Sequence, residues 1–173
     1  MKAKDITGKA FHHTVKDVDT LQALARMLPE NPVIVNIGAC FGTSTLAMLE
    51  ARPDAFIFSI DINICPKEPK HIKMAGADRA SVIRVLGPSQ DAGVYWPQQV
   101  DMVFVDGAHG YPEVVRDIRA WSNKVKPNGI LAFHDYDKEM LPHVKRAVDD
   151  EMKGLEPLLQ IESIRAYQWN GID

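Results

Sequence analysis

The sequence predicts an α/β fold with a single doubly wound sheet of seven strands, made of five parallel βα units and a C-terminal β-hairpin. Short runs of β-branched and apolar residues alternate with segments of helical periodicity along the 173 residues. Four of the first five runs are nearly all apolar, which is typical of strands that are covered on both faces. The last two runs follow each other without a helix, as the strands of a hairpin do. This combination is typical of a Rossmann-like domain.

Each strand run is short and is separated from the next by a turn or by a helical segment. The predicted strands are 33–37, 56–60, 81–86, 100–105 and 130–133, with the hairpin at 158–164 and 165–170. The predicted helices are 19–28, 43–51, 112–125 and 142–153, and the segment 65–77 is interpreted as one short helix with a loop. Pro112 suits the first turn of its helix, and Asn128-Gly129 predicts a turn before the fifth strand.

Length and composition favour one domain over residues 1–173, in which residues 1–30 form an N-terminal helical or lid segment. Lys and Arg total 20 and Asp and Glu total 23, which gives a net charge of -3 without a run of like charges. Nucleic acid is therefore not expected as a partner.

The chain also lacks the features of membrane and secreted proteins. No apolar stretch approaches the roughly 20 residues that span a bilayer, so no membrane partner is expected. The first nine residues lack the apolar core of a signal peptide, and the two cysteines form no Cys-x-x-Cys pair. A cytoplasmic location is expected. The oligomeric state is left open, a homo-oligomer included.

Candidate binding residues follow the strands, because open α/β sheets bind ligands at the carboxyl ends of their strands. After the first strand, Gly38 and Gly42 allow a tight turn and the close approach of a ligand to the backbone. Their G-x-x-x-G spacing differs from the G-x-G-x-x-G of nicotinamide dinucleotide sites and lacks the lysine of a P-loop. A nicotinamide-dependent oxidoreductase is therefore disfavoured.

Polar residues also follow the second and third strands. Asp61 can accept hydrogen bonds from both ribose hydroxyls of a nucleoside, although a helix cap would use the same residue type. Ser89 and Gln90 offer donors and acceptors that suit an adenine edge, or they form a polar turn.

The glycine loop, Asp61 and the Gly-x-Ser-Gln-Asp run at 87–91 together resemble the class I methyltransferases that use S-adenosylmethionine (SAM). The pattern is similar to that of metal-dependent O-methyltransferases, both the catechol branch and a branch that acts on sugar hydroxyls. The resemblance covers the chain from about residue 6 to its end. It implies cofactor contacts by Gly38, Gly42 and Ser44 to the methionine part, Asp61 to the ribose, and Ser89 and Gln90 to the adenine. Asp106, at the end of the fourth strand, is also expected to contact the cofactor, near its methyl group. Asn36 stands where this family usually has Glu, and it can still hydrogen-bond the amino-acid end of SAM.

A second set of residues ends the fourth and fifth strands, which are expected to be neighbours. Asp106 and Asp135 are candidates to share a divalent cation near the methyl group of the cofactor. In the similar metal-dependent enzymes, a general base follows the first Asp by three positions and two further metal ligands follow it by 28, which here are His109 and His134-Asp135. The cation would be Mg²⁺ or Mn²⁺, and the imidazole of His134 favours Mn²⁺, Fe²⁺, Co²⁺ or Zn²⁺ over Mg²⁺.

The resemblance implies O-methylation of a small hydroxylated acceptor, a sugar or another small molecule, assisted by the cation at Asp106, His134 and Asp135. His109 would take the hydroxyl proton. A methyltransferase without a metal, in which His109 or His134 acts alone, and a SAM-binding module without catalysis are left open. His12 and His13, ahead of the first helix, are interpreted as a solvated pair; this segment can form part of a lid in the similar sugar-type enzymes, so a substrate contact is left open.

Overall fold

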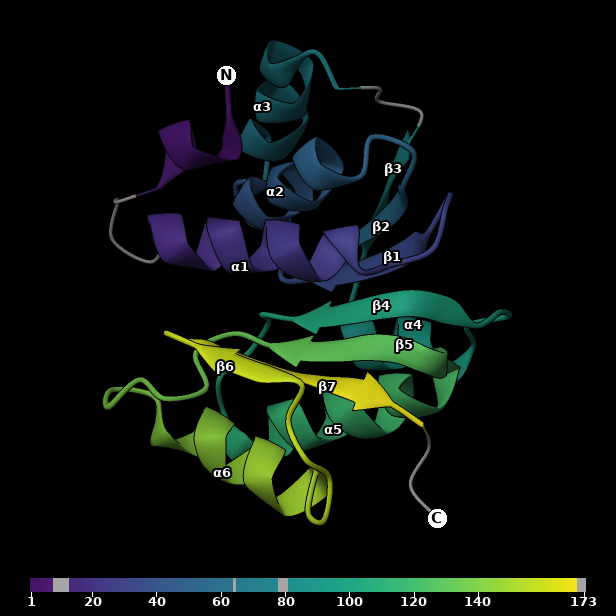
Figure 1. Cartoon of the computed structure of the whole chain (residues 1–173), viewed down its shortest axis with the longest axis vertical. Coiled ribbons are helices and arrows are strands. Elements are labelled where there is room, and N and C mark those ends of the chain that lie inside the picture. Colours follow the sequence, from purple (N-terminus) through teal and green to yellow (C-terminus); the bar gives the residue numbers. More distant parts are fainter. Residues whose placement is uncertain (8–12, 64, 78–80, 171–173) are drawn as a thin grey trace.

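Seven strands form one sheet in the described part of the computed structural model, which comprises residues 1–7, 13–63, 65–77 and 81–170. Their order is β3-β2-β1-β4-β5-β7-β6, with β1 to β5 parallel and β7 antiparallel to both β5 and β6. The predicted fold class and hairpin are confirmed (Figure 1). The strands are β1 (Val33–Ile37), β2 (Phe56–Asp61), β3 (Val82–Leu86), β4 (Val100–Val105), β5 (Val125–Phe133), β6 (Leu159–Ile161) and β7 (Ile164–Trp169).

Helices cover both faces of the sheet and bury a hydrophobic core on each. Helices α1 to α3 lie on one face and α4 to α6 on the other (Figure 1). Because successive strand residues point to opposite faces, Ile34 packs into the first core and Val35 into the second. The helices are α1 (Val15–Arg26), α2 (Thr43–Ala51), α3 (Lys67–Ala75), α4 (Ser89–Val94), α5 (Tyr111–Trp121) and α6 (Pro142–Glu151), with short 3₁₀ turns at Ala3–Ile6 and Ser122–Lys124. Among the described residues, no helix combines the length and the apolar character needed to cross a membrane.

The structure corrects the region before the fifth strand. The predicted helix 112–125 ends at Trp121, and β5 already begins at Val125. The turn predicted at Asn128-Gly129 therefore lies inside β5, where the register against β4 shifts. Asn128 has a φ of 64°, and a Cβ on Gly129 would lie 2.9 Å from the backbone oxygen of Asp101. The two residues form an irregularity within the strand and do not precede it.

Two further elements differ from the prediction. Ser89 and Gln90 open the short helix α4, so the polar-turn interpretation of these residues is wrong. The first helix begins at Val15, earlier than predicted, because the Thr14 side chain caps the backbone N–H of Asp17 and Asp17 caps Thr14 in return. His13 directly precedes this capping box.

Candidate functional site

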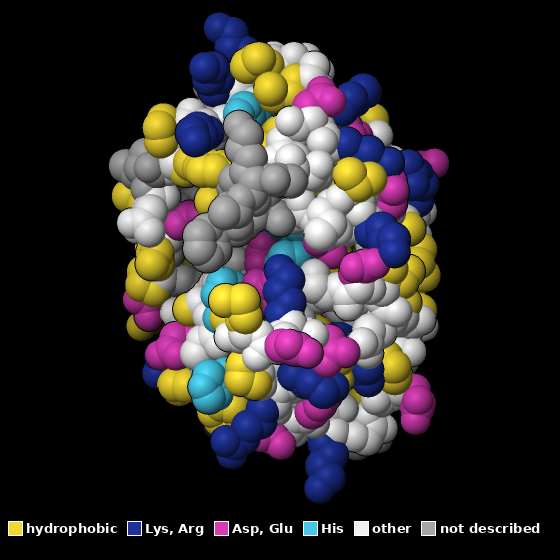
Figure 2. All heavy atoms as spheres, turned by 90° about the vertical axis from the view of Figure 1, so that its left-hand side faces the viewer, with side chains coloured by type: hydrophobic (Ala, Val, Ile, Leu, Met, Phe, Trp, Pro, Cys, Tyr) yellow, Lys and Arg dark blue, Asp and Glu magenta, His cyan; other side chains and the backbone are white. Residues whose placement is uncertain are grey.

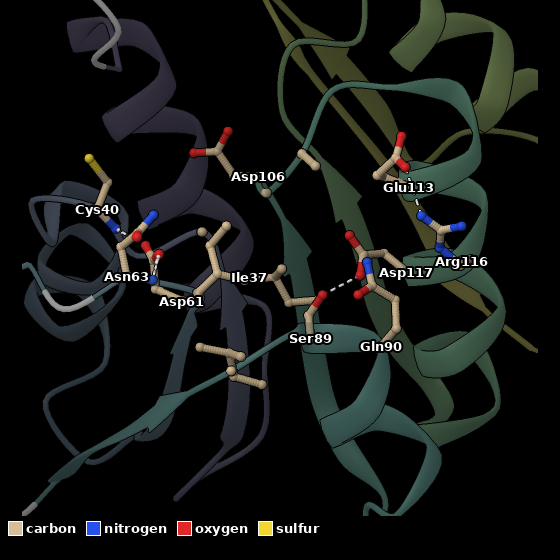
Figure 3. Close-up of a pocket in the computed structure, with 16 residues that line it drawn as sticks. Ile37, Cys40, Asp61, Asn63, Ser89, Gln90, Asp106, Glu113, Arg116 and Asp117 are labelled. Atoms are coloured by element: carbon tan, nitrogen blue, oxygen red, sulfur yellow. Dashed lines mark hydrogen bonds and ion pairs between the residues drawn. The ribbon is translucent and has the colours of Figure 1, made fainter.

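A cavity of about 430 Å³ opens at the carboxyl ends of the central parallel strands, where the order switches between β1 and β4 (Figure 3). Its volume falls within the roughly 300–1,000 Å³ of small-molecule sites. Five residues that the sequence assigns to the cofactor line it: Gly38, Asp61, Ser89, Gln90 and Asp106. The strand ends therefore converge on one concave site.

Gly38 allows the loop after β1 to lie directly against the end of β4. Its φ is +83°, and a Cβ at this position would lie 1.9 Å from the backbone oxygen of Asp106. Its N–H donates to the carbonyl oxygen of Ile60 at 2.8 Å, which ties the loop to β2. Only glycine combines a positive φ at low cost with the absence of a Cβ.

Asp61 is held with its carboxylate against the cavity. Oδ2 accepts a hydrogen bond from the N–H of Cys40 at 2.9 Å, and Oδ1 accepts one from the N–H of Asn63 at 2.8 Å. Each carboxylate oxygen has a further lone pair. The carboxylate is therefore oriented in advance to accept a pair of vicinal hydroxyls.

Asp117 is a cavity residue that the sequence analysis missed. It lies on α5 and its side chain is buried beside Ser89 and Gln90 (Figure 3). The Ser89 hydroxyl donates to Asp117 Oδ1. Burial raises the pKa of Asp117 to about 6. A signal was present, because position 117 follows Val114 by three residues and therefore falls on the apolar face of the helix.

We expect an Asp117→Asn variant to be more stable than the wild type above pH 6. The folded-state pKa lies above the ordinary 3.8, so the stabilising contribution of the protonated carboxyl is complete below pH 4 and is lost as pH rises through about 6. The free energy of unfolding of the variant, relative to that of the wild type, should rise by up to about 3 kcal/mol between pH 4 and pH 7. Urea unfolding across this range measures it. Glu113→Gln, which removes a partly exposed carboxylate on the same helix, is the control, and a pH-independent difference for Asp117→Asn would contradict the expectation.

Three residues assigned to the cofactor do not line the cavity. The Asn36 side chain is buried and donates to Ser44 Oγ at 3.0 Å and to Thr45 Oγ1 at 2.9 Å. Thr45 in turn donates to Glu68 Oε1 at 3.0 Å. A Cβ on Gly42 would lie 2.8 Å from Glu68 Cγ. Asn36 and Ser44 thus belong to a buried polar network, and Gly42 packs against the Glu68 side chain of that network. Glu68 was not among the residues predicted for the site.

A histidine and carboxylate cluster adjoins the cavity at Asp106. His134 Nδ1 lies 2.9 Å from Asp106 Oδ1 and 3.1 Å from Asp135 Oδ1. Its Nε2 lies 3.4 Å from Oδ2 of Asp17, a buried residue of α1. Burial alone would lower the pKa of His134, but these carboxylates outweigh it and raise the pKa to about 12.

His13 belongs to this cluster, so its interpretation as a solvated residue is wrong; His12 lies outside the described residues. The His13 side chain is only 8% exposed, and its Nε2 lies 3.3 Å from Asp106 Oδ2. Its ring packs against His134 at 4.4 Å and Phe104 at 6.0 Å between ring centroids. Burial lowers the pKa of His13. The capping box at the start of α1 directs the chain into the site.

His109, the predicted base, lies on the loop after β4 and is paired with Asp135. Its Nε2 is 2.9 Å from Asp135 Oδ2, and this contact raises the pKa of His109. Lys138 forms an ion pair with Oδ1 of the same carboxylate. Burial opposes ionisation, but hydrogen bonds from His109 and His134 lower the pKa of Asp135. His109 is partly exposed and lies beside the cavity without lining it.

The donor atoms of the cluster form two overlapping groups that suit a metal ion. In each group the atoms lie within 4.8 Å of one another, and the groups are His13, Asp106 and His134, and Asp106, His109 and Asp135. The predicted metal ligands Asp106, His134 and Asp135 are divided between the two. Figure 2 shows histidine and acidic side chains gathered near the middle of one face, beside lysine or arginine.

Comparison with known proteins identifies the family of the chain. The family described as the methyltransferase domain matches residues 35–136, a segment that contains every residue predicted for the cofactor, the base and the metal. The chain is also similar to an uncharacterized protein of Acanthamoeba polyphaga mimivirus, with 27% identity over 190 residues that cover 96% of this chain and 81% of the other.

Solved structures share the fold at low sequence identity. A Klebsiella pneumoniae protein provisionally described as an O-methyltransferase matches with a TM-score of 0.77 and 16% identity, over 94% of this chain and 84% of the other. A TDP-rhamnose 3′-O-methyltransferase of calicheamicin biosynthesis matches at 0.66 and 15%, over 89% and 77%. An rRNA methylase from Streptococcus thermophilus matches at 0.66 and 16%, over 96% and 99%. Since the last two score alike, the fold alone does not select the acceptor.

Proposed function

The chain belongs to the methyltransferase domain family and is a SAM-dependent methyltransferase, and from this premise we propose that it methylates a hydroxyl of a small acceptor. One observation carries the proposal. Asp106 lines the cofactor-sized cavity and also belongs to both groups of the histidine and carboxylate cluster. The proposed binding cavity and the candidate acid–base groups thus meet at a single residue at the end of β4.

The cavity residues fit SAM. Asp61 presents two oriented oxygens for the ribose hydroxyls, and Gly38 lines the same cavity, where the amino-acid part would lie along the backbone. Gln90 and Asp117 lie together on the opposite side of the cavity, where they suit the polar edge of an adenine (Figure 3). When bound, SAM supplies a methyl group on a positively charged sulfur.

His109 is proposed to accept the proton of the acceptor hydroxyl. Donation of Nε2–H to Asp135 leaves Nδ1 as the nitrogen with a free lone pair. The Asp135 carboxylate fixes the tautomer and stabilises the imidazolium that forms, and Lys138 holds that carboxylate in place. The half-exposed position of His109 gives an acceptor access to it.

A divalent cation, Mg²⁺ or Mn²⁺, is proposed to assist. Asp106, His134 and Asp135 were predicted to hold it, and they lie in contact with one another around His134 Nδ1. When bound, such an ion would lower the pKa of a hydroxyl that it coordinates. The donor set of carboxylates and imidazoles fits a divalent ion of this kind.

One specific observation supports the second candidate, a reaction without a metal. Asp17, Asp106 and Asp135 surround His134 and raise its pKa to about 12, so a protonated imidazole already supplies positive charge at this position. Dialysis against EDTA separates the two candidates. Loss of turnover that Mn²⁺ restores supports the cation, and unchanged turnover supports the imidazolium.

The acceptor is proposed to be small, with a sugar hydroxyl as the leading class. The carboxylates of the cluster disfavour a polyanion such as RNA, whose binding depends on phosphate neutralisation. Formation of S-adenosylhomocysteine (SAH) from SAM should be measured with hydroxylated sugars, catechols, carboxylic acids and an RNA hairpin. Turnover with a hydroxylated small molecule supports the proposal, and turnover with RNA alone contradicts it.

We expect Asp61→Ala to weaken SAH binding by about 10- to 100-fold, because a charged hydrogen-bond acceptor contributes roughly 1.5–3 kcal/mol. Isothermal titration calorimetry with SAH measures the change. The matched control is Asp54→Ala, which removes a carboxylate that also accepts a backbone N–H, from Asn31 at 2.7 Å, at the opposite end of β2. Equal SAH affinity in the Asp61 variant and the wild type would place the ribose elsewhere.

A further inference from the structure

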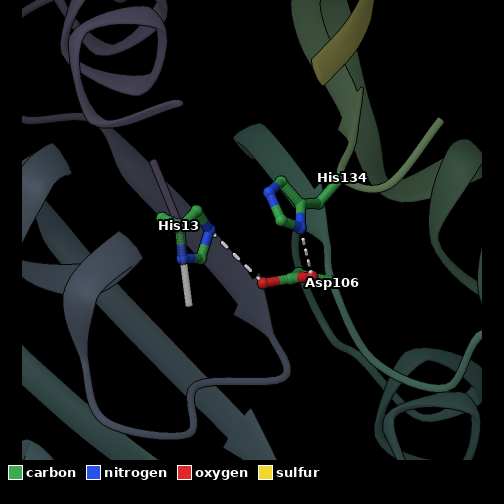
Figure 4. Close-up of side chains that lie close together, drawn as sticks. All are labelled: His13, Asp106 and His134. Atoms are coloured by element: carbon green, nitrogen blue, oxygen red, sulfur yellow. Dashed lines mark hydrogen bonds and ion pairs between the residues drawn. The ribbon is translucent and has the colours of Figure 1, made fainter. Parts of the chain in front are cut away.

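We propose that His13, Asp106 and His134 form a transition-metal site of two imidazoles and one carboxylate beside the cofactor cavity. The inference rests on the proposed function, because the ion would serve the same methyl transfer. The ligand set differs from the predicted one, because His13 of the N-terminal segment replaces Asp135 as the third ligand. Figure 4 shows the two imidazoles directed at the Asp106 carboxylate.

The donor atoms converge at the spacing that an ion requires. His13 Nε2 lies 3.3 Å from Asp106 Oδ2, and His134 Nδ1 lies 2.9 Å from Asp106 Oδ1. All three residues offer atoms within 4.8 Å of one another. Metal–ligand bonds of about 2.1 Å place neighbouring ligand atoms about 3.0–3.4 Å apart. Small side-chain shifts therefore suffice to coordinate an ion.

His13 is buried, and its Nε2 makes no hydrogen bond within the described part of the chain. The whole residue is 7% exposed, and this nitrogen is directed at the Asp106 carboxylate. A buried polar atom without a hydrogen bond destabilises the fold unless a ligand completes it. A metal ion at this position would complete it.

Asp17 supports His134 from behind. With Nδ1 directed at Asp106, the opposite ring nitrogen of His134 lies 3.4 Å from Asp17 Oδ2. Asp17 is itself held by the N–H and hydroxyl of Thr14, at 2.7 and 2.9 Å, and by the hydroxyl of Ser163 at 2.9 Å. Metal-bound histidines commonly direct their second nitrogen at a carboxylate in this way. Asp17 would be a positioning residue for the site.

Asp135 is better suited to pairing with His109 and Lys138 than to binding the ion. His109 and Lys138 both pair with its carboxylate, and a lysine ammonium beside a carboxylate competes with a cation for its oxygens. Two imidazoles and one carboxylate select Mn²⁺, Fe²⁺, Co²⁺ or Zn²⁺ over Mg²⁺, which prefers oxygen ligands. Three protein ligands also leave coordination positions for an acceptor hydroxyl.

Metal binding by the full chain, freed of metal beforehand, tests the site. Calorimetry with Co²⁺ and with Mg²⁺, together with the visible spectrum of bound Co²⁺, should show one site that binds Co²⁺ at least tenfold more tightly than Mg²⁺. His13→Ala should weaken Co²⁺ binding by at least tenfold and alter the spectrum. His143→Ala, which removes an exposed histidine on α6, should change neither.

A second measurement needs no variant. Pulsed EPR of the Cu²⁺-loaded wild type counts the imidazoles at the metal. Two imidazoles support the proposal, and one or none overturns it. Unchanged Co²⁺ affinity in His13→Ala also overturns it, as does a wild type that binds no Co²⁺.

SAH titrations of the same samples separate this inference from the proposed function. SAH binding without Co²⁺ binding overturns the metal site alone. Absence of both overturns the metal site and the proposed cofactor cavity together.

Discussion

Gly38→Ala is expected to abolish detectable SAH binding and to lower the free energy of unfolding by about 2–5 kcal/mol. The new Cβ would lie 1.9 Å from the backbone oxygen of Asp106 and 2.5 Å from its carbonyl carbon. Both atoms belong to the end of β4, which cannot yield as a flexible side chain would. The φ of +83° adds the cost of a left-handed conformation. Either the glycine loop or the end of β4 must move, and both form the cavity.

Urea unfolding and SAH calorimetry of this variant test the expectation. Gly76→Ala is the matched control, because Gly76 also has a positive φ, of +71°, but no atom lies within 4 Å of a Cβ placed there. The control should lose roughly 1 kcal/mol of stability and retain SAH binding. If Gly38→Ala binds SAH as tightly as the wild type, the strand ends do not form the cofactor site described above.

His109→Gln is expected to lower kcat by about 10²- to 10⁴-fold, the usual contribution of a general base. Gln keeps a polar side chain that can donate to Asp135, but it cannot take a proton from a hydroxyl. The KM for SAM should stay within about twofold, because His109 does not line the cavity. The loss should therefore appear in the chemical step alone.

Steady-state kinetics with the acceptor found in the screen measure this effect. His143→Gln, at an exposed position of α6, controls for the removal of an imidazole. A fall in kcat of less than tenfold would mean that the hydroxyl loses its proton by another route. In that case His134 and the carboxylates around it would be the groups to test.

Much of the architecture was predictable from local pattern. Apolar runs with β-branched residues marked each parallel strand, and the positions directly after those strands included Gly38, Asp61 and Asp106. The same rule gathered these residues at one edge of the sheet, where the structure has its cavity. The turn at Asn128-Gly129 was predicted before the fifth strand but lies within it, because a turn signal carries no information about pairing with the neighbouring strand β4.

Side-chain direction and burial depended on packing between distant segments. Asn36 on β1 and Ser44 on α2 flank the loop that contains Gly38, yet their side chains belong to a buried hydrogen-bond network that also includes Glu68. Asp117 reaches the cavity because α5 packs its apolar face on the sheet. His13 and Asp17 meet His134 only because α1 crosses the same end of the sheet. The order and ends of the strands follow from local periodicity, whereas contacts between residues more than 100 positions apart exist only once the layers have packed.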